Sequence, residues 1–290
     1  MVSKVNKKFL GGKTEIVIPH YEDFLEEKGV HLRDSRGYLY FHPSAFGGCI
    51  RKMAFQFHSE NDDRFKTKEP IDIKFMRICD TGHAFHDRMQ RDLSIMGLLR
   101  GWWKCRSCGE TIGKEEPLGI FLPETCKCMA KKKDDKRKGI KLFEYEEIYL
   151  ISDPKYNFRG NCDGIVELER GNPESRYIID FKSINEGGFS YLRKPDQKYI
   201  MQVMIYMWLS GVKKSIIYYE DKNKHQLAEF EVPYDEGLVD YIKTSSRKLK
   251  KICNLGKIPK IHKDYKNDKK PCFAYSKKCE YYDFCYGDRI

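Results

Sequence analysis

The chain has 290 residues, of which 40% are hydrophobic and 33% are charged, and its formal net charge is +11 at pH 7. This composition is ordinary for a soluble globular protein with a well-buried core, built as one domain with insertions or as a large and a small domain. The most apolar segment, residues 199–211, is too short to cross a bilayer and contains Gln202, which argues against a membrane protein. The first 18 residues contain lysines but no sustained apolar core before a cleavage site, so we expect an intracellular, cytoplasmic protein.

The excess positive charge favours a polyanionic partner. The pI is about 9.0, and nucleic acid is favoured over a membrane because no basic amphipathic anchor stands out. Much of the lysine lies in residues 130–141 and 257–271. Each of these segments is equally typical of a solvated loop and of a surface that follows a phosphate backbone.

Helices and strands predicted from hydrophobic spacing alternate along the chain. Helices are expected at residues 21–28, 45–58, about 73–97, 195–209 and 237–253, with Ser44 as a cap and Pro195 opening the fourth. Strands are expected at residues 143–151, 158–169, 176–184, 213–220 and 226–233. A cysteine-rich segment that ends near residue 141 interrupts this series. The pattern predicts an α/β fold around a mixed sheet.

Eleven cysteines in a chain without an export signal indicate metal binding rather than disulfide bonds. Two residues separate Cys105 from Cys108, and Cys126 and Cys128 follow after a loop. Two such pairs can form a tetrahedral thiolate site for structural zinc, although the spacing of the second pair is tighter than usual.

The other cysteines form a scattered set and some single residues. Cys49 lies near the start of the chain, and Cys272, Cys279 and Cys285 lie near its end. The remaining ones, Cys79, Cys162 and Cys253, are expected to be small core residues.

Residues 176–184, RYIIDFKSI, place an acid and a lysine on one face of an expected strand. Side chains alternate along a strand, so Asp180 and Lys182 are neighbours. Each charge is costly to bury alone, and an ion pair on an edge strand is the simplest explanation.

A hairpin between the two preceding strands would add a second carboxylate. If residues 169–176 connect them, antiparallel partners sum to about 343 to 345, and Asp163 lies opposite Asp180, Phe181 or Lys182. Two carboxylates beside a lysine can hold a hard divalent cation and leave the ammonium for a water or an anion.

The helix that begins at Pro195 is apolar nearly all round and is expected to be buried. Gln202 and Tyr206 are four residues apart and share one face of this helix. A buried amide and a buried hydroxyl need polar partners, which a metal site or a bound phosphate would supply.

Four short motifs in order resemble a known enzyme family. They are Gly82-x3-His86, Gly160-x2-Asp163-Gly164, Asp180-x-Lys182 and Gln202-x3-Tyr206. Together they resemble the RecB-type branch of the PD-(D/E)XK nuclease superfamily. Cys49 within "HPSAFGGCIRKMAF" and three cysteines at the far end resemble the iron-sulfur nucleases of this branch, the CRISPR-associated adaptation exonucleases and the AddB-type nucleases. The resemblance covers about residues 41–97 and 143–285.

The resemblance implies a restriction-endonuclease-like core with a mixed central sheet, an inserted zinc ribbon and a 4Fe-4S cluster that joins the two ends of the chain. The implied cluster ligands are Cys49, Cys272, Cys279 and Cys285. The implied ligands of Mg or Mn are His86, Asp163, Asp180 and the Phe181 carbonyl. Lys182 would position and help deprotonate the attacking water, Gln202 would orient Lys182 or the water, and Tyr206 would hold backbone or phosphate.

Alternatives stay open for single residues. For His86 the alternative is a hydrogen-bonded core histidine, and His83 lies three residues earlier on the same helix. Six residues separate Cys272 from Cys279, where the family has two, so Cys272 is the least certain cluster ligand. The inserted cysteine segment could contact DNA, guide a strand, recruit a partner or need zinc only to fold.

The expected organisation has four parts: residues 1–98, N-terminal helical part with the first cluster cysteine and the histidine; 99–141, zinc-ribbon insertion with basic tail; 142–255, nuclease core; and 256–290, basic linker and cluster-binding segment. The expected function is metal-dependent DNA cleavage, as an exonuclease on single strands or ends in recombination, repair or replication, beside a helicase, recombinase or other DNA-processing partner. The alternatives are an inactive DNA-binding scaffold, an RNA-directed nuclease and a sequence-specific endonuclease.

Overall fold

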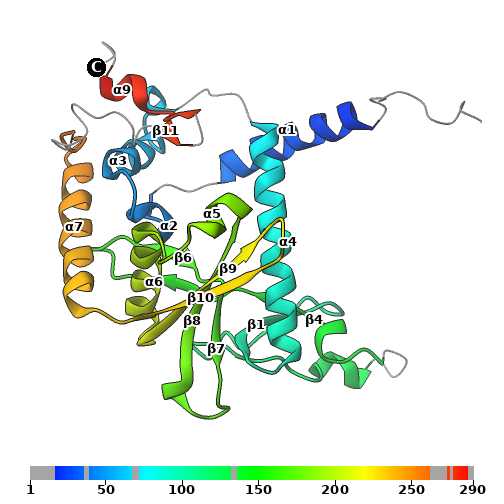
Figure 1. Ribbon diagram of the computed structural model, residues 1–290. Coiled ribbons are helices and arrows are strands. Elements are labelled where there is room, and N and C mark those ends of the chain that lie inside the picture. The colour runs from blue at the N-terminus through cyan, green and yellow to red at the C-terminus, as the bar shows by residue number, and fades with distance from the viewer. Residues whose placement is uncertain are drawn as a thin grey trace, which may run out of the picture. The chain divides into compact units, whose positions relative to one another are not determined.

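The computed structural model describes residues 17–35, 39–66, 72–131, 136–261, 273–274 and 277–286 (Figure 1). The chain divides into two compact units, one within residues 1–37 and 68–81 and the other within residues 38–67 and 82–290. In the first unit, Lys28 of α1 (Ile18–Ser35) forms an ion pair with Asp80, with Nζ 2.6 Å from Oδ1. Asp80 belongs to α4 (Ile73–Ile95), whose residues from Gly82 on belong to the second unit.

The second unit is built on an eight-stranded mixed sheet with the order β10-β9-β8-β7-β1-β2, in which β3 and β4 also pair with β1. The pairs are antiparallel except for β8 and β9, which are parallel and joined through α6. The strands are β1 (Leu99–Cys105), β2 (Thr111–Ile112), β3 (Ile120–Phe121), β4 (Phe143–Glu146), β7 (Gly164–Glu167), β8 (Arg176–Ile184), β9 (Lys214–Asp221) and β10 (Leu227–Pro233). The predicted α/β fold with a mixed central sheet is confirmed.

Two small ladders lie outside the main sheet: β5 (Tyr149–Ile151) with β6 (Arg159–Asn161), and β11 (Phe273–Ala274) with β12 (Lys277–Lys278). The remaining α-helices are α2 (Pro43–Phe46), α3 (Ile50–Ser59), α5 (Glu186–Ser190), α6 (Gln197–Ser210), α7 (Glu236–Asn254) and α9 (Tyr282–Tyr286). Among the described residues, no helix is both long and apolar enough to span a membrane.

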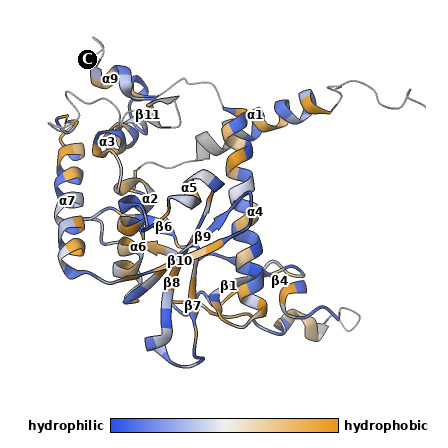
Figure 2. Ribbon diagram, in the orientation of Figure 1, coloured by the Kyte–Doolittle hydropathy of each residue, from blue (hydrophilic) through white to orange (hydrophobic). Residues whose placement is uncertain are grey.

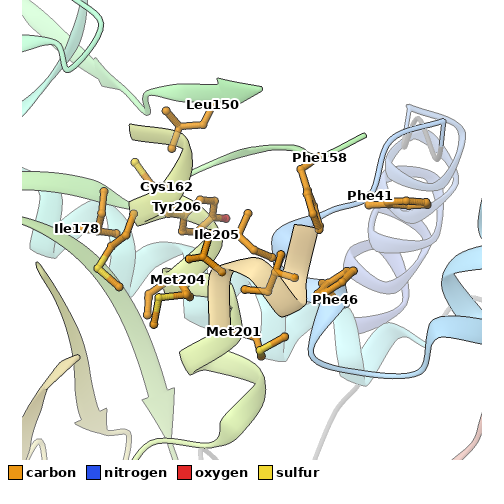
Figure 3. Close-up of a cluster of buried hydrophobic side chains, with 14 of the residues drawn as sticks. Phe41, Phe46, Leu150, Phe158, Cys162, Ile178, Met201, Met204, Ile205 and Tyr206 are labelled. Atoms are coloured by element: carbon orange, nitrogen blue, oxygen red, sulfur yellow. The ribbon is translucent and has the colours of Figure 1, made fainter. Parts of the chain in front are cut away.

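Alternate residues of β8 face opposite layers. Ile178 belongs to the large apolar cluster that contains α6, whereas Ile179 and Phe181 pack with Phe85 of α4. Figure 3 shows the α6 side, where Met201, Met204, Ile205 and Tyr206 lie beside Ile178, Phe158 and Phe46. The predicted alternation of β8 therefore places Asp180 towards α6.

Helix α7 is amphipathic, as its mixed colouring in Figure 2 shows. Its buried residues recur at helical spacing: Val239, Ile242, Ser246, Leu249 and Cys253. The Asp235 carboxylate accepts a hydrogen bond from the Leu238 N–H, which caps the helix at its start. Arg247, Lys248 and Lys251 are exposed on the same helix.

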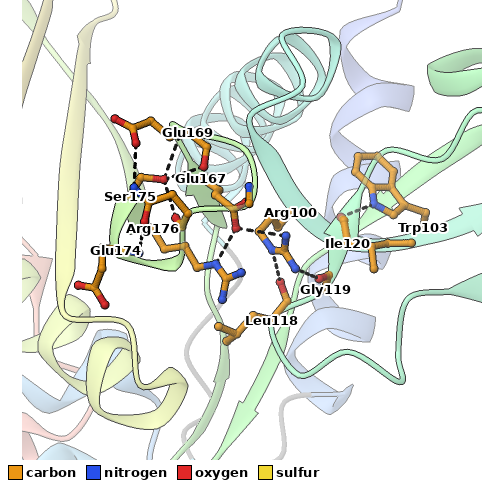
Figure 4. A network of polar contacts seen from close by, with 12 residues as sticks. Arg100, Trp103, Leu118, Gly119, Ile120, Glu167, Glu169, Glu174, Ser175 and Arg176 are labelled. Carbon is orange, nitrogen blue, oxygen red and sulfur yellow. Dashed lines mark hydrogen bonds and ion pairs between the residues drawn. The ribbon is translucent and has the colours of Figure 1, made fainter.

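A buried carboxylate ties β1, β7 and β8 together (Figure 4). Glu167 is 1% exposed, and its Oε2 lies 2.6 Å from Arg176 Nε and 3.2 Å from Arg100 Nη1. Burial opposes the charge on Glu167, but Arg176, the Gly171 N–H and Arg100 outweigh burial and lower its pKa. The Glu167 carboxylate is paired with Arg176 and Arg100 within the fold, so we interpret this ion cluster as structural.

Several predicted elements are divided. The helix expected at residues 45–58 is interrupted between α2 and α3, where Cys49 has an extended backbone (φ −80°, ψ 112°). The strand expected at 143–151 becomes β4 and β5 in different ladders, and the one at 158–169 becomes β6 and β7. The second break lies at Cys162 and Asp163.

Candidate active site

His86 projects from α4 towards the middle of β8. Its Nε2 lies 3.1 Å from the carbonyl oxygen of Phe181, and its Nδ1 lies 3.6 Å from Asp163 Oδ1. Burial, followed by the charge of Lys182, lowers the pKa of His86. The ring is therefore a neutral imidazole near pH 7, the form that can ligate a metal.

Asp163 lies where the chain leaves β6 and enters β7, and its Oδ2 accepts a 2.7 Å hydrogen bond from the Phe181 N–H. Gly164 pairs with Ile179 in the antiparallel ladder, so the predicted register holds and Asp163 follows on towards Asp180. Burial raises the pKa of Asp163 to about 6, against the opposing effect of Lys182 and the Phe181 N–H.

Asp180 and Lys182 form an ion pair on the α6 face of β8. Lys182 Nζ lies 2.6 Å from Asp180 Oδ2, and Gln202 Nε2 donates to Asp180 Oδ1 at 3.0 Å. The Asp180 side chain is fully buried, and burial raises its pKa to about 6. Burial also opposes the charge on Lys182, but Asp180 and Asp163 outweigh burial and raise the pKa of Lys182, which keeps it an ammonium.

Tyr206 lies one helical turn beyond Gln202 on α6, and it is 4% exposed. Burial, and then the charges of Asp163 and Asp180, raise the pKa of its phenol well above the usual range. A hydrogen bond from the Gln202 side chain opposes this rise only in part. Tyr206 is thus a neutral hydroxyl that can donate a hydrogen bond at this end of the sheet.

The sequence did not single out Glu147, which follows β4 directly. One ligand atom each from His86, Glu147 and Asp163 lies within 4.8 Å of the other two. Gln90, one turn beyond His86 on α4, donates from Nε2 to Glu147 Oε1 at 3.0 Å and to the Asp163 carbonyl at 2.8 Å. The doublet Glu146-Glu147 within an apolar segment is the one signal the sequence carries, and it does not say which glutamate points inward.

The donor set suits a hard divalent cation. Carboxylate oxygens are the ligands that Mg²⁺ prefers, and an added imidazole nitrogen also suits Mn²⁺. Asp163 Oδ1 and His86 Nδ1 face each other across 3.6 Å, as two ligands of one ion would. The residues present therefore fit the metal that the sequence predicted.

Four thiols gather at the other end of β1. Cys105 Sγ lies 3.7 Å from Cys128 Sγ, and Cys108 Sγ lies 3.8 Å from Cys126 Sγ. Zinc–thiolate bonds of about 2.3 Å in a tetrahedron place sulfur atoms about 3.8 Å apart. All four sulfur atoms lie within 4.8 Å of one another, so they fit one tetrahedral ion.

The surroundings of Cys105 favour its thiolate form. Burial opposes the thiolate, but hydrogen bonds from the backbone N–H groups of Ser107 and Cys108 outweigh burial and lower its pKa to about 7. Trp103 and Phe143 pack around this cysteine cluster and are fully buried. The segment thus has its own small core beside the thiols.

The segments that carry the early and the late cysteines pack together at α3. Cys49 is the residue before α3, and Arg51 Nε donates to Cys285 Sγ at 3.3 Å. Phe55 of α3 stacks on Tyr281, with ring centroids 5.1 Å apart. Burial raises the pKa of Cys279, and the nearby Cys49 adds to the rise. Cys272 lies outside the described residues.

Comparisons with known proteins find structural likeness at low similarity. No family model and no curated protein matches the chain. A solved structure of SSO0001 is 14% identical over 82% of this chain and 87% of its own, with a TM-score of 0.42. The alkaline exonuclease LHK-Exo of Laribacter hongkongensis, in complex with dAMP, is 14% identical over 75% and 89%, with a TM-score of 0.42.

A phage-related exonuclease from Haemophilus somnus 129PT is 16% identical over 35% of this chain and 56% of its own, with a TM-score of 0.25. Each of these TM-scores is 0.42 or lower, so we assign neither family nor activity to the chain from them.

Proposed function

We propose that this protein is a metal-dependent nuclease that hydrolyses DNA phosphodiester bonds on a PD-(D/E)XK-type core, as an exonuclease acting on single strands or ends. The observation that carries the proposal is the ion pair of Asp180 and Lys182, buried on β8 next to Asp163 and His86. The order of these residues along the chain supports the RecB-type branch.

A structural role alone does not account for this arrangement. A buried ion pair contributes little net stability, because desolvating both charges offsets their attraction. Here a second carboxylate, Asp163, is buried beside the pair, although burial disfavours its charge. Such a cluster costs stability, and groups that cost stability in this way are typical of functional sites.

In the proposed site, His86, Asp163, Asp180 and the Phe181 carbonyl hold Mg or Mn. The bound ion would make water a usable nucleophile near neutral pH and offset charge on the phosphate. The Lys182 ammonium orients the water or a phosphate oxygen beside Asp180. Gln202 fixes the Asp180 carboxylate, and Tyr206 donates to backbone or phosphate.

The two cysteine sets have separate proposed roles. The set of Cys105, Cys108, Cys126 and Cys128 holds structural zinc, which the sulfur spacing supports. The second set holds a 4Fe-4S cluster through Cys49, Cys272, Cys279 and Cys285. The meeting of Cys49 with the segment of Cys279 and Cys285 at α3 supports this second proposal.

The charge of the chain supports DNA as the partner. The formal net charge is +11, and α7 exposes Arg247, Lys248 and Lys251. Such a surface attracts phosphate independently of base sequence. A helicase or recombinase beside it would supply strands or ends.

The test is cleavage of end-labelled substrates by anaerobically purified protein. Single- and double-stranded DNA labelled at the 5′ or 3′ end, and RNA, are incubated with Mn or Mg and with chelator. We expect metal-dependent release of short products from single strands or ends of DNA. Cleavage of RNA but not DNA, or no cleavage of any substrate by folded, metal-loaded protein, would overturn the proposal.

A further inference from the structure

Glu147 and Gln90 belong to none of the sequence motifs that assign residues to the site. Glu147 comes from the turn after β4, whereas the motif residues come from α4, β8, α6 and the start of β7. It nevertheless closes a three-residue group with His86 and Asp163. We propose that Glu147 is a further ligand of the divalent ion and that Gln90 holds it in place.

The first support is how the other carboxylates are occupied. Both oxygens of Asp180 have protein partners, Gln202 at Oδ1 and Lys182 at Oδ2. An ion at Asp180 would share that carboxylate with Lys182 and Gln202. By contrast, Asp163 Oδ1 faces His86, and Glu147 approaches the same point. An ion placed there finds its first three protein ligands without a rearrangement of Asp180.

The second support is charge. Glu147, Asp163 and Asp180 are three carboxylates, and the Lys182 ammonium pairs with Asp180. Fully ionised, this set has two negative charges in excess, which a single divalent cation would balance.

Gln90 acts through Glu147 and is therefore a positioning residue. It is 6% exposed, and its amide bridges Glu147 Oε1 and the Asp163 carbonyl. The same helix, α4, presents His86 one turn earlier, so ligand and positioning group have a fixed spacing. Partners of this kind orient metal-binding carboxylates, and their loss costs about 10- to 100-fold in metal affinity.

The inference rests on the metal site of the proposed function, but its test does not use cleavage. Mn²⁺ is titrated into the full, zinc-loaded chain without DNA, and free Mn²⁺ is followed by electron paramagnetic resonance. We expect Glu147→Gln to raise the Kd for Mn²⁺ by at least about tenfold. Its neighbour Glu146, which pairs with Lys114 at 3.8 Å, gives the matched control, and Glu146→Gln should keep the parent Kd.

Gln90→Leu removes the amide but keeps most of the side-chain volume, and we expect it to raise the Kd by about tenfold at an unchanged melting temperature. The inference is overturned if Glu147→Gln leaves the Kd for Mn²⁺ unchanged, or if Glu146→Gln raises that Kd by as much as Glu147→Gln does. If Glu147→Gln does not fold, Glu147→Ala replaces it, because it also removes the carboxylate, and a parent-like Kd in that variant overturns the inference.

Binding and cleavage separate the two proposals. A parent chain that binds Mn²⁺ through Glu147 but cleaves no nucleic acid supports this inference and overturns the proposed function. A parent chain that cleaves DNA while Glu147→Gln keeps its Mn²⁺ affinity overturns this inference alone.

Discussion

Lys182 Nζ lies 2.6 Å from Asp180 Oδ2, and both side chains project from the α6 face of β8. Gln202 Nε2 completes the contact from α6, at 3.0 Å from Asp180 Oδ1. Asp163 and His86 meet at the same end of the sheet. The strand therefore carries two charges on one face next to groups that can bind an ion.

Proton binding at Asp163 makes the metal-free protein sensitive to pH. Its pKa is about 6 when folded and about 3.9 in an unfolded chain, so between these values the folded state binds the additional proton. The contribution of Asp163 to stability is therefore lost as the pH rises from about 4 to about 6. Asp163→Asn should remove this loss.

The measurement is the free energy of unfolding of parent and Asp163→Asn from pH 4 to pH 8, without divalent metal. We expect the stability of the variant relative to the parent to increase as the pH rises from about 4 to about 6. Added Mn²⁺ should reverse the order above that pH, because the ion binds the ionised carboxylate. A difference that stays constant with pH would contradict the burial of a strained carboxylate at this position.

The zinc site predicts one zinc per chain. Because four thiolates complete a tetrahedral shell, Cys105→Ser or Cys126→Ser should lose the ion and leave most of the main sheet folded. Elemental analysis with circular dichroism measures both. Cys79→Ser is the control, since Cys79 belongs to the other compact unit. Unchanged zinc content in both cluster variants would contradict the assignment.

The second cysteine set predicts a coloured protein. Anaerobically purified chain should be brown and contain iron, and Cys49→Ala should bleach it and lower its melting temperature, because the cluster closes a very long loop. A colourless, iron-free protein that is stable and active would rule out the cluster. Iron retained in Cys272→Ala alone would mean that another group fills that position.

Local spacing explains which parts of the fold could be predicted. The alternation of β8 and the hairpin length fixed the facing of Asp180 and Asp163, because strand periodicity and register are short-range properties. The helical spacing likewise predicted α4, whereas His86 was assigned to the site by the resemblance to the nuclease motifs.

Long-range contacts explain what could not be predicted. The break between α2 and α3 lies at Cys49, whose backbone is extended, and hydrophobic spacing along the chain gives no sign of it. Glu147 reaches the site because β4 and β5 join different ladders, and a single apolar segment gives no sign of that division. Periodicity alone predicts neither the contact of Gln90 with Glu147 nor the direction in which the Glu147 side chain points.

The central claim is that Lys182 serves the reaction and not only its ion pair. The most direct measurement is the cleavage rate per folded molecule of Lys182→Ala, with melting temperature and Mn²⁺ affinity taken on the same preparation. Lys213→Ala is the control, because Lys213 is an exposed lysine that directly precedes β9. We expect Lys182→Ala to lose cleavage by about a hundredfold or more while Mn²⁺ binding persists, because the ammonium acts on the transition state. A variant that is less stable but cleaves at the parent rate per folded molecule would show that β8 carries only a structural pair.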